Sequence, residues 1–280
     1  MNFLNAVLLG IVQGVAEFLP ISSSGHLSLM QGLLGIGGLA ELDNNAVYNV
    51  MLHIGTLVAV FVAYWDDIRD MIVELFVMVT GRAKAGKVEK NMPMRRQILM
   101  MIIATLPLFL VLPVEDQIQS IGAYPLLVGI ALIINGTILF IGDRLPRGTK
   151  DEKGITALDA LLIGLCQAVA TAPGISRSGI TITAGMGRKL DRAYAVKFSF
   201  LLSLVAVAGA VFLKVLDLFK MEIDVAALPA YLVGMVIAGV VGYASIKLLQ
   251  KIVDKGKFGG FAYYCWIVGA LAVVGSLVKG

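Results

Sequence analysis

Charged residues are scarce in this sequence of 280 residues, and their scarcity excludes most soluble proteins. Only 15% of the residues are Asp, Glu, Lys or Arg, whereas 58% are hydrophobic, above the roughly 45–50% that is typical of soluble domains. Residues 1–39 contain no Lys, Arg or Asp, and their only carboxylate is Glu17. Apolar runs of about 20 residues recur along the chain, which is the length that crosses a bilayer core of about 30 Å. The composition therefore predicts an all-α polytopic membrane protein.

The small number of cysteines and the composition of the N-terminal residues restrict the class of protein further. The only two cysteines, Cys166 and Cys265, both lie in apolar segments, so we expect no disulfide framework. The N-terminus lacks a basic region and a small-residue cleavage site, and Gln13 and Glu17 interrupt its apolar run, so we do not expect a signal peptide. The net charge of +4 resides in short loops between apolar runs, a pattern that sets membrane orientation and does not indicate a nucleic-acid partner.

Six apolar runs have the length of full membrane spans. They are roughly Val47–Tyr64, Ile98–Val114, Tyr124–Ile141, Ala193–Val215, Ala226–Leu249 and Phe261–Val278. The linker after the first span is rich in basic residues, among them Lys84, Lys87 and Lys90, and should be cytoplasmic, whereas Glu115–Ala123 has no Lys or Arg and should face outside. The alternation places both termini outside. The stretch around Ile68–Thr80 either extends the first span or lies at the interface.

Two further apolar segments, Asn2–Leu39 and Ile155–Gly187, are related to each other. When the first is shifted by 154 positions, GIVQGVAEFLPISSSG (10–25) lies on GLCQAVATAPGISRSG (164–179) without a gap, and eight of sixteen residues agree. The sequence therefore predicts one membrane domain built by tandem duplication, with repeat 1 at about 1–145 and repeat 2 at about 155–280. Each half would add an odd number of crossings, which inverts the second half relative to the first.

The related segments have the length of re-entrant hairpins. In the second, the arm after Ser178 runs only to Arg188, and about nine helical residues cover about 14 Å, half a bilayer. We therefore expect two re-entrant helical hairpins beside the six transmembrane helices, with their tips meeting near the membrane centre. The alternative is two ordinary helices joined by a polar turn at the surface. Non-helical backbone at mid-depth must line a water-filled cavity or be buried in protein.

The polar residues of these tips are the candidate functional residues. Gln13 and Glu17 are four apart and share one helical face, and a glutamate at membrane depth marks a functional site by default. A structural ion pair between Glu17 and Arg177 is the alternative. Each tip also holds serines that are natural helix N-caps and a glycine that permits close backbone approach. These are Ser22 or Ser24 with Gly25, and Ser176 or Ser178 with Gly179.

Two helix N-termini beside an arginine form an anion site. We therefore expect a phosphate group there, and His26 among the hydroxyls suggests a catalytic histidine. His53, one turn from Asn49 in the first span, is interpreted as a supporting polar group. This chemistry could hydrolyse a phosphate ester or anhydride carried on a lipid, with a divalent cation bridging Glu17 and the phosphate oxygens.

At these residues the sequence resembles the undecaprenyl-diphosphate phosphatase family, the bacitracin-resistance membrane phosphatases. The resemblance rests on QGVAEFLPISSSGH (13–26) and PGISRSGIT (173–181), and it extends through residues 49–65 and 198–207. It implies removal of the terminal phosphate from C55-isoprenyl diphosphate, which recycles the lipid carrier for peptidoglycan synthesis and confers resistance to bacitracin. It further implies a divalent cation, Mg²⁺ or Ca²⁺, and a site opening to the outer side of the bacterial plasma membrane.

Carried over by position, the essential residues of the family fall on seven positions of this chain. They are Glu17, Ser23, His26, Ser176, Arg177, Ser178 and Thr181. The resemblance assigns phosphate clamping to Arg177, phosphate hydrogen bonds to the hydroxyls of the second tip, and the role of base or metal ligand to Glu17. Gln13 stands where the family motif allows Glu or Gln, and an amide cannot act as a base.

Three questions stay open at this point. The nucleophile or proton shuttle is His26 or Ser23, with His26 slightly favoured. A different function, an inverted-repeat transporter or flippase of a phosphorylated lipid, fits the same architecture. The expected partners are the isoprenyl diphosphate and the lipid bilayer, with no nucleic acid, and the chain could act alone or as a homodimer.

Overall fold

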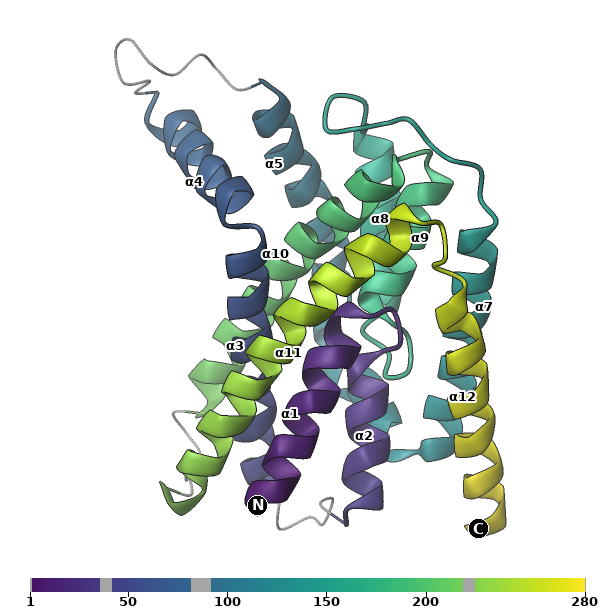
Figure 1. Ribbon diagram of the computed structural model, residues 1–280. Coiled ribbons are helices and arrows are strands. Elements are labelled where there is room, and N and C mark those ends of the chain that lie inside the picture. Colours follow the sequence, from purple (N-terminus) through teal and green to yellow (C-terminus); the bar gives the residue numbers. More distant parts are fainter. Residues whose placement is uncertain (1, 36–41, 82–91, 219–224, 280) are drawn as a thin grey trace.

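Helices make up the protein in the computed structural model, which describes residues 2–35, 42–81, 92–218 and 225–279 (Figure 1). In that part of the chain the one β-type pairing is an isolated bridge between Lys150 and Leu190. The basic residues Lys84, Lys87 and Lys90, on which the predicted orientation partly rests, lie outside the described residues. The cytoplasmic placement of their loop therefore stays a prediction.

Five helices and one bent pair of helices are apolar and long enough to cross a membrane among the described residues. They are α3 (Leu42–Ala63) with α4 (Trp65–Thr80), α5 (Met92–Thr105), α7 (Pro125–Asp143), α10 (Arg192–Leu218), α11 (Leu228–Asp254) and α12 (Gly260–Lys279). The short helices η2 (Leu106–Leu110), η3 (Leu112–Val114), α6 (Glu115–Gln119) and η4 (Ser120–Ala123) continue α5, and η5 (Val225–Ala227) precedes α11. Five of the six predicted spans are thus confirmed, and the predicted span Val47–Tyr64 falls on α3, the first helix of the bent pair.

Helix α4 bends away from α3 by 86°, at the break between Ala63 and Trp65. This angle fits a helix that lies along the membrane surface, the second of the two alternatives for this stretch, better than an extension of the span. Two ion pairs hold α4 in place. The Lys197 ammonium of α10 lies 2.5 Å from Asp67 Oδ1, and Arg95 of α5 pairs with the buried Glu74.

Two pairs of short helices form hairpins that enter from opposite ends of the molecule. The first is α1 (Phe3–Phe18) with α2 (Ser23–Leu33), and the second is α8 (Ala157–Val169) with α9 (Arg177–Gly187). At 1.5 Å per residue, even the 16 residues of α1 fall short of a bilayer core of about 30 Å. Figure 1 shows the open end of the first hairpin beside both termini and that of the second at the opposite end, with the tips meeting between. The two predicted hairpins are thus present, with arms too short to cross a bilayer, and their re-entrant placement in the membrane stays a prediction.

Equivalent glycines of the two hairpins make equivalent contacts. Gly10 of α1 packs against the backbone oxygen of Gly234 on α11, and Gly164 of α8, 154 positions later, packs against that of Ala104 on α5. A methyl group at either glycine would collide with the facing oxygen. Each hairpin thus packs backbone to backbone against a span of the other half, as an inverted duplication predicts. The repeat boundaries near 145 and 155 stay a prediction.

The base of the second hairpin is anchored by a buried carboxylate. Asp159, near the start of α8, pairs with Lys150 and with Arg188, each at 2.7 Å, and its side chain is fully buried. Asp159 also completes a capping box with Thr156, so it satisfies the first turn of α8 as well. These contacts join both arms of the second hairpin to the loop that precedes α8, and so they fix the base of the hairpin.

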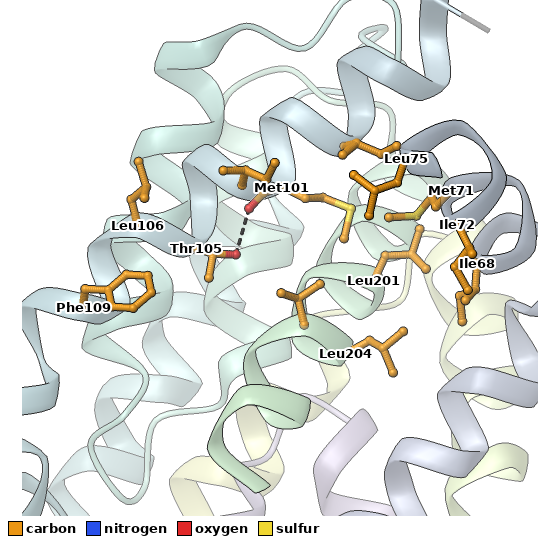
Figure 2. A pocket seen from close by; sticks show the side chains of 13 residues that line it. Ile68, Met71, Ile72, Leu75, Met101, Thr105, Leu106, Phe109, Leu201 and Leu204 are labelled. Carbon is orange, nitrogen blue, oxygen red and sulfur yellow. Dashed lines mark hydrogen bonds between the residues drawn. The ribbon is translucent and has the colours of Figure 1, made fainter. Parts of the chain in front are cut away.

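An apolar groove of about 330 Å³ lies between α4, α5 and α10, away from the hairpin tips (Figure 2). Its lining includes Met71, Met101, Phe109 and Leu204, and its one hydroxyl, that of Thr105, donates to Met101 O at 2.8 Å. The groove has no ionisable side chain in its lining, so it holds no catalytic chemistry.

Candidate active site

The hairpin tips are capped in the same way in both halves. Ser22 Oγ accepts from Gly25 N at 3.3 Å, and Ser176 Oγ accepts from Gly179 N at 3.2 Å, so the first serine of each predicted pair is the cap. Ser22 has a φ of 74°, an uncommon conformation for a residue with a side chain. Gly174 N of the opposite tip donates to Ser22 Oγ at 3.1 Å and helps to hold it there. Such local strain tends to occur at functional sites.

Asn135, in the middle of α7, joins the two tips. Its Nδ2 donates to Pro20 O at 2.9 Å, and its Oδ1 accepts from Ser176 N at 2.9 Å. Ser178 Oγ adds a direct link by donating to Phe18 O at 3.3 Å. Since α7 is a full span, the tips lie near mid-depth, and their backbone polar groups are satisfied inside the protein as that depth requires.

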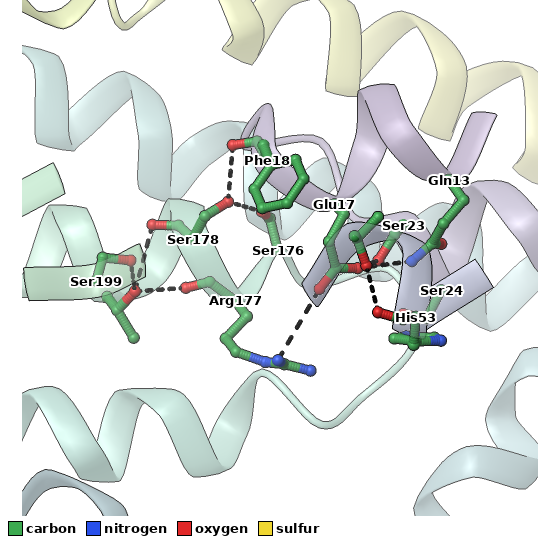
Figure 3. A network of polar contacts seen from close by, with 12 residues as sticks. Gln13, Glu17, Phe18, Ser23, Ser24, His53, Ser176, Arg177, Ser178 and Ser199 are labelled. Carbon is green, nitrogen blue, oxygen red and sulfur yellow. Dashed lines mark hydrogen bonds and ion pairs between the residues drawn. The ribbon is translucent and has the colours of Figure 1, made fainter. Parts of the chain in front are cut away.

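Glu17 is the centre of the polar network between the tips (Figure 3). Its Oε2 accepts from Ser23 Oγ at 2.6 Å and from Gln13 Nε2 at 3.1 Å. Its Oε1 lies 4.0 Å from Arg177 Nη1, which is too long for a hydrogen bond. The Glu17 side chain is 10% exposed and that of Arg177 31%. The structure thus brings together four of the predicted residues around one carboxylate.

Two polar atoms near Glu17 have no hydrogen-bond partner within the described residues. They are the buried Nη1 of Arg177 and the buried Oε1 of Gln13. Leaving such groups unpaired costs about 1–3 kcal/mol each, and more for a charged group. One donor and one acceptor near the Glu17 carboxylate are thus available to a ligand.

His53 is a member of this site that the sequence did not reveal as one. It lies on α3, and Figure 3 draws it beside Ser24 in the Glu17 network. In the same view its ring lies on the side of the network on which the Arg177 guanidinium lies. The position of His53 inside an apolar run suggested only a supporting role, because a single sequence does not tell which neighbour α3 faces.

The hydroxyls of the second tip are used inside the protein. Ser176 Oγ lies 3.1 Å from Ser178 Oγ, and Thr181 Oγ1 lies 2.6 Å from Ser199 Oγ of α10 and donates to Arg177 O at 2.7 Å. These bonds fix the backbone that carries Arg177. The predicted hydrogen bonds from these hydroxyls to phosphate stay a prediction.

Ser24 and the two glycines of the tips, Gly25 and Gly179, were also predicted to belong to the site. Ser24 is exposed, with its Oγ 3.5 Å from Ser22 Oγ. Gly25 packs against Gly174, and a methyl group there would lie 2.9 Å from Gly174 Cα, so the tips touch through glycine as expected. At Gly179 the neighbours are side chains, since a methyl group there would lie 3.0 Å from Leu139 Cδ2 and 3.2 Å from Pro20 Cβ, so the predicted close backbone approach is seen at Gly25 alone of the two.

His26 has both ring nitrogens engaged in the protein. Nδ1 lies 2.8 Å from Ser22 O, and Nε2 lies 3.0 Å from the hydroxyl of Tyr264 on α12, whose ring stacks on the imidazole with centroids 5.5 Å apart. The structure shows no contact between His26 and Glu17 or Arg177 among the described residues. Sequence reasoning could not find Tyr264, which is 238 positions away.

Comparisons with known proteins match the full length of the chain. The model of the family described as "Bacitracin resistance protein BacA" matches residues 6–271. The chain belongs to the BacA family. A protein of Methanosphaera stadtmanae named undecaprenyl-diphosphatase is 37% identical over 283 residues, 99% of both chains. Proteins with the same name are 38% identical in Methanobrevibacter smithii, over 99% of both chains, and 36% identical in Alkaliphilus metalliredigens, over 99% of this chain and all of the relative.

The residues of this BacA family member offer few ligands for a metal ion. Among the described residues, no cluster of three His, Cys, Asp or Glu side chains could hold one. The Glu17 carboxylate and the unpartnered Gln13 Oε1 are two oxygen ligands next to each other. Mg²⁺ is often bound through one or two carboxylates together with substrate phosphates. The site therefore fits a cation that shares its coordination with the substrate.

Proposed function

We propose that this chain hydrolyses undecaprenyl diphosphate to undecaprenyl phosphate and inorganic phosphate. Family membership supports the assignment, and so does the name shared by relatives that cover nearly the whole chain. The observation that carries it is the convergence of Ser23, Glu17 and Arg177 between the hairpin tips, where the Arg177 Nη1 has no hydrogen-bond partner among the described residues. The products would return the lipid carrier to peptidoglycan synthesis, which accounts for bacitracin resistance in the family.

Arg177 and the two helix N-termini would bind the terminal phosphate. Arg177 and Ser23 are the first residues of α9 and α2, where backbone N–H groups are free of intrahelical partners. Positive helix-dipole ends and unpaired N–H groups favour an anion. The guanidinium adds a planar fork for two phosphate oxygens, and its Nη1 is still without an acceptor among the described residues.

Ser23 would attack the terminal phosphorus, with Glu17 as its base. The 2.6 Å bond from Ser23 Oγ to Glu17 Oε2 places the carboxylate where it can take the hydroxyl proton. The bond between the terminal phosphorus and the bridging oxygen breaks, and its electron pair leaves with undecaprenyl phosphate, which receives the proton from Glu17. Water then attacks the phosphoserine while Glu17 takes one proton from the water, and the bond between phosphorus and Ser23 Oγ breaks. Glu17 returns that proton to Ser23 Oγ, which regenerates the hydroxyl and releases inorganic phosphate. His26 would position the tip through Ser22 and Tyr264.

Glu17 and Gln13 would hold the divalent cation, Mg²⁺ or Ca²⁺, on the face of the site toward the phosphates. When bound, such an ion neutralises phosphate charge and polarises the phosphoryl oxygen. All residues named for the reaction belong to one chain, so the reaction does not require a homodimer. We place the protein in the plasma membrane with both termini and the site on the outer side, on the basis of the loop charges alone.

Phosphate release in detergent tests this proposal. Purified protein in micelles should release inorganic phosphate from undecaprenyl diphosphate, a product that a transporter or flippase cannot make. The architecture of inverted hairpins is shared with transporters, but no residue contact in the described site favours transport over hydrolysis. Movement of the intact diphosphate across a vesicle membrane, without phosphate release in detergent, would favour the transporter instead.

A further inference from the structure

His53 faces the Glu17 network from α3, and the proposed mechanism does not use it. Figure 3 shows the His53 ring and the Arg177 guanidinium on the same side of the network, with the Glu17 carboxylate between them in this view. No hydrogen bond or ion pair joins His53 and Glu17 in the part of the chain that the structure describes. The imidazole therefore faces the network without being bonded to Glu17.

The proton of the neutral His53 ring is placed by the backbone. Nδ1 lies 2.8 Å from Asn49 O, and a carbonyl oxygen only accepts, so Nδ1 carries the hydrogen. Nε2 has no hydrogen-bond partner among the described residues, although the histidine is half-buried at membrane depth. Nε2 is thus the ring atom that can meet a ligand, and in the imidazolium form it is a charged donor.

The charge of the substrate calls for such a donor. A diphosphate carries several negative charges, whereas in the site Arg177 contributes one positive charge and Glu17 one negative charge. Apart from the proposed divalent cation, the charges of Arg177 and Glu17 cancel, so the side chains of the network offer the second phosphate no net positive charge without His53. A second cationic donor would complement the second phosphate, because charge-assisted hydrogen bonds to phosphate are the strong ones.

The position of His53 selects one of the two phosphates. The terminal phosphate must lie at Ser23 and Arg177 to be attacked. The other phosphate bears the isoprenyl chain, which has to leave toward lipid. Beyond His53, α3 presents lipid-facing side chains such as Val58 and Val62, which are 55% and 59% exposed. We propose that His53 Nε2 binds the phosphate that carries the isoprenyl chain, and so stabilises the leaving group. This inference rests on the proposed function.

Product inhibition tests the assignment of His53 to the chain-bearing phosphate, because each product of the reaction occupies one of the two phosphate sites. Hydrolysis of substrate labelled in the terminal phosphate is measured with added isoprenyl monophosphate or added inorganic phosphate. In His53→Ala, the inhibition constant for isoprenyl monophosphate should rise about tenfold or more, as expected for a lost hydrogen bond to a charged group. The constant for inorganic phosphate should stay within about twofold. His53→Gln, whose amide can still donate, should lie between His53→Ala and the wild type.

Two matched variants complete the design. Arg177→Lys should weaken inhibition by inorganic phosphate, the reverse selectivity. Val58→Ala, on the same helix but facing lipid, should change neither constant. If His53→Ala and His53→Gln weakened inhibition by both products equally, or weakened neither, the assignment of His53 to the chain-bearing phosphate would be overturned. A wild-type protein that releases no phosphate would instead refute the proposed function, so the two failures are distinguishable. If His53→Ala melts below the assay temperature, His53→Gln alone decides by the same criterion.

Discussion

Ser23 and Arg177 occupy equivalent positions of the two hairpins, 154 residues apart, and their side chains meet at the same carboxylate. Ser23 Oγ donates to Glu17 Oε2 at 2.6 Å, and Arg177 Nη1 lies 4.0 Å from Glu17 Oε1. The duplicated tips supply two capped helix N-termini, and a difference at one position gives one of them a hydroxyl and the other a guanidinium. The position equivalent to Glu17 is Thr171, so only one half carries the base.

The short bond between Ser23 and Glu17 predicts that both side chains are needed for turnover. Glu17→Gln should lower kcat by about 10²–10⁴, the usual contribution of a general base, and Ser23→Ala should lower it at least as much. Rapid quenching with labelled substrate should trap an acid-stable phosphate on Ser23. Ser120→Ala, which removes an exposed hydroxyl that donates to Gln117 O, is the matched control. An acid-labile, base-stable label on histidine would restore His26 as the nucleophile.

The contact between His26 and Tyr264 predicts that these two residues act as a unit. Tyr264→Phe removes the hydroxyl that lies 3.0 Å from His26 Nε2 and should lower both the melting temperature and turnover. In a double-mutant cycle with His26→Ala, residues in contact should show a coupling of about 0.5–3 kcal/mol. The measurement is kcat and thermal melting of the two single variants and the double variant. Strictly additive effects would mean that His26 acts on substrate without its tyrosine.

Asn135 should be a weak point for both stability and activity. Asn135→Leu keeps the size of the side chain but leaves Pro20 O and Ser176 N unpaired inside the protein. Each unpaired group costs about 1–3 kcal/mol, so we expect a clearly lower melting temperature and a large loss of phosphate release. Ile134→Ala, a lipid-facing change at the next position, is the control. A variant Asn135→Leu with normal melting and turnover would show that the tips are held together by other means.

The small number of protein ligands makes a prediction about the metal. Because Glu17 and Gln13 supply only two oxygens, Mg²⁺ or Ca²⁺ alone should barely change the melting temperature. The same ion together with inorganic pyrophosphate should raise it, since the phosphates would complete the coordination. Glu17→Gln should abolish this joint effect. A large shift with metal alone, in protein free of phosphate, would point to a metal site built by the chain itself.

Much of this architecture could be predicted from the sequence because it follows from local patterns. The six spans follow from the lengths of the apolar runs, and the hairpins follow from the match at a shift of 154. The convergence of Glu17 with Ser23 and Arg177 follows from the same symmetry. Contacts between side chains of different helices, such as Asn135 with Ser176 or His26 with Tyr264, could not be predicted from the sequence. Their partners lie on helices whose rotation is set by packing, and no periodicity records it.

The most direct test is the product balance of purified protein in detergent micelles supplied with undecaprenyl diphosphate and Mg²⁺. We predict one inorganic phosphate and one undecaprenyl phosphate for each diphosphate consumed. Under the same conditions Glu17→Gln, once shown by its melting curve to be folded, should form both products at least about 10²-fold more slowly. Release of phosphate by Glu17→Gln at the wild-type rate, or recovery of intact undecaprenyl diphosphate from the wild-type reaction, would contradict a hydrolytic site between the hairpin tips.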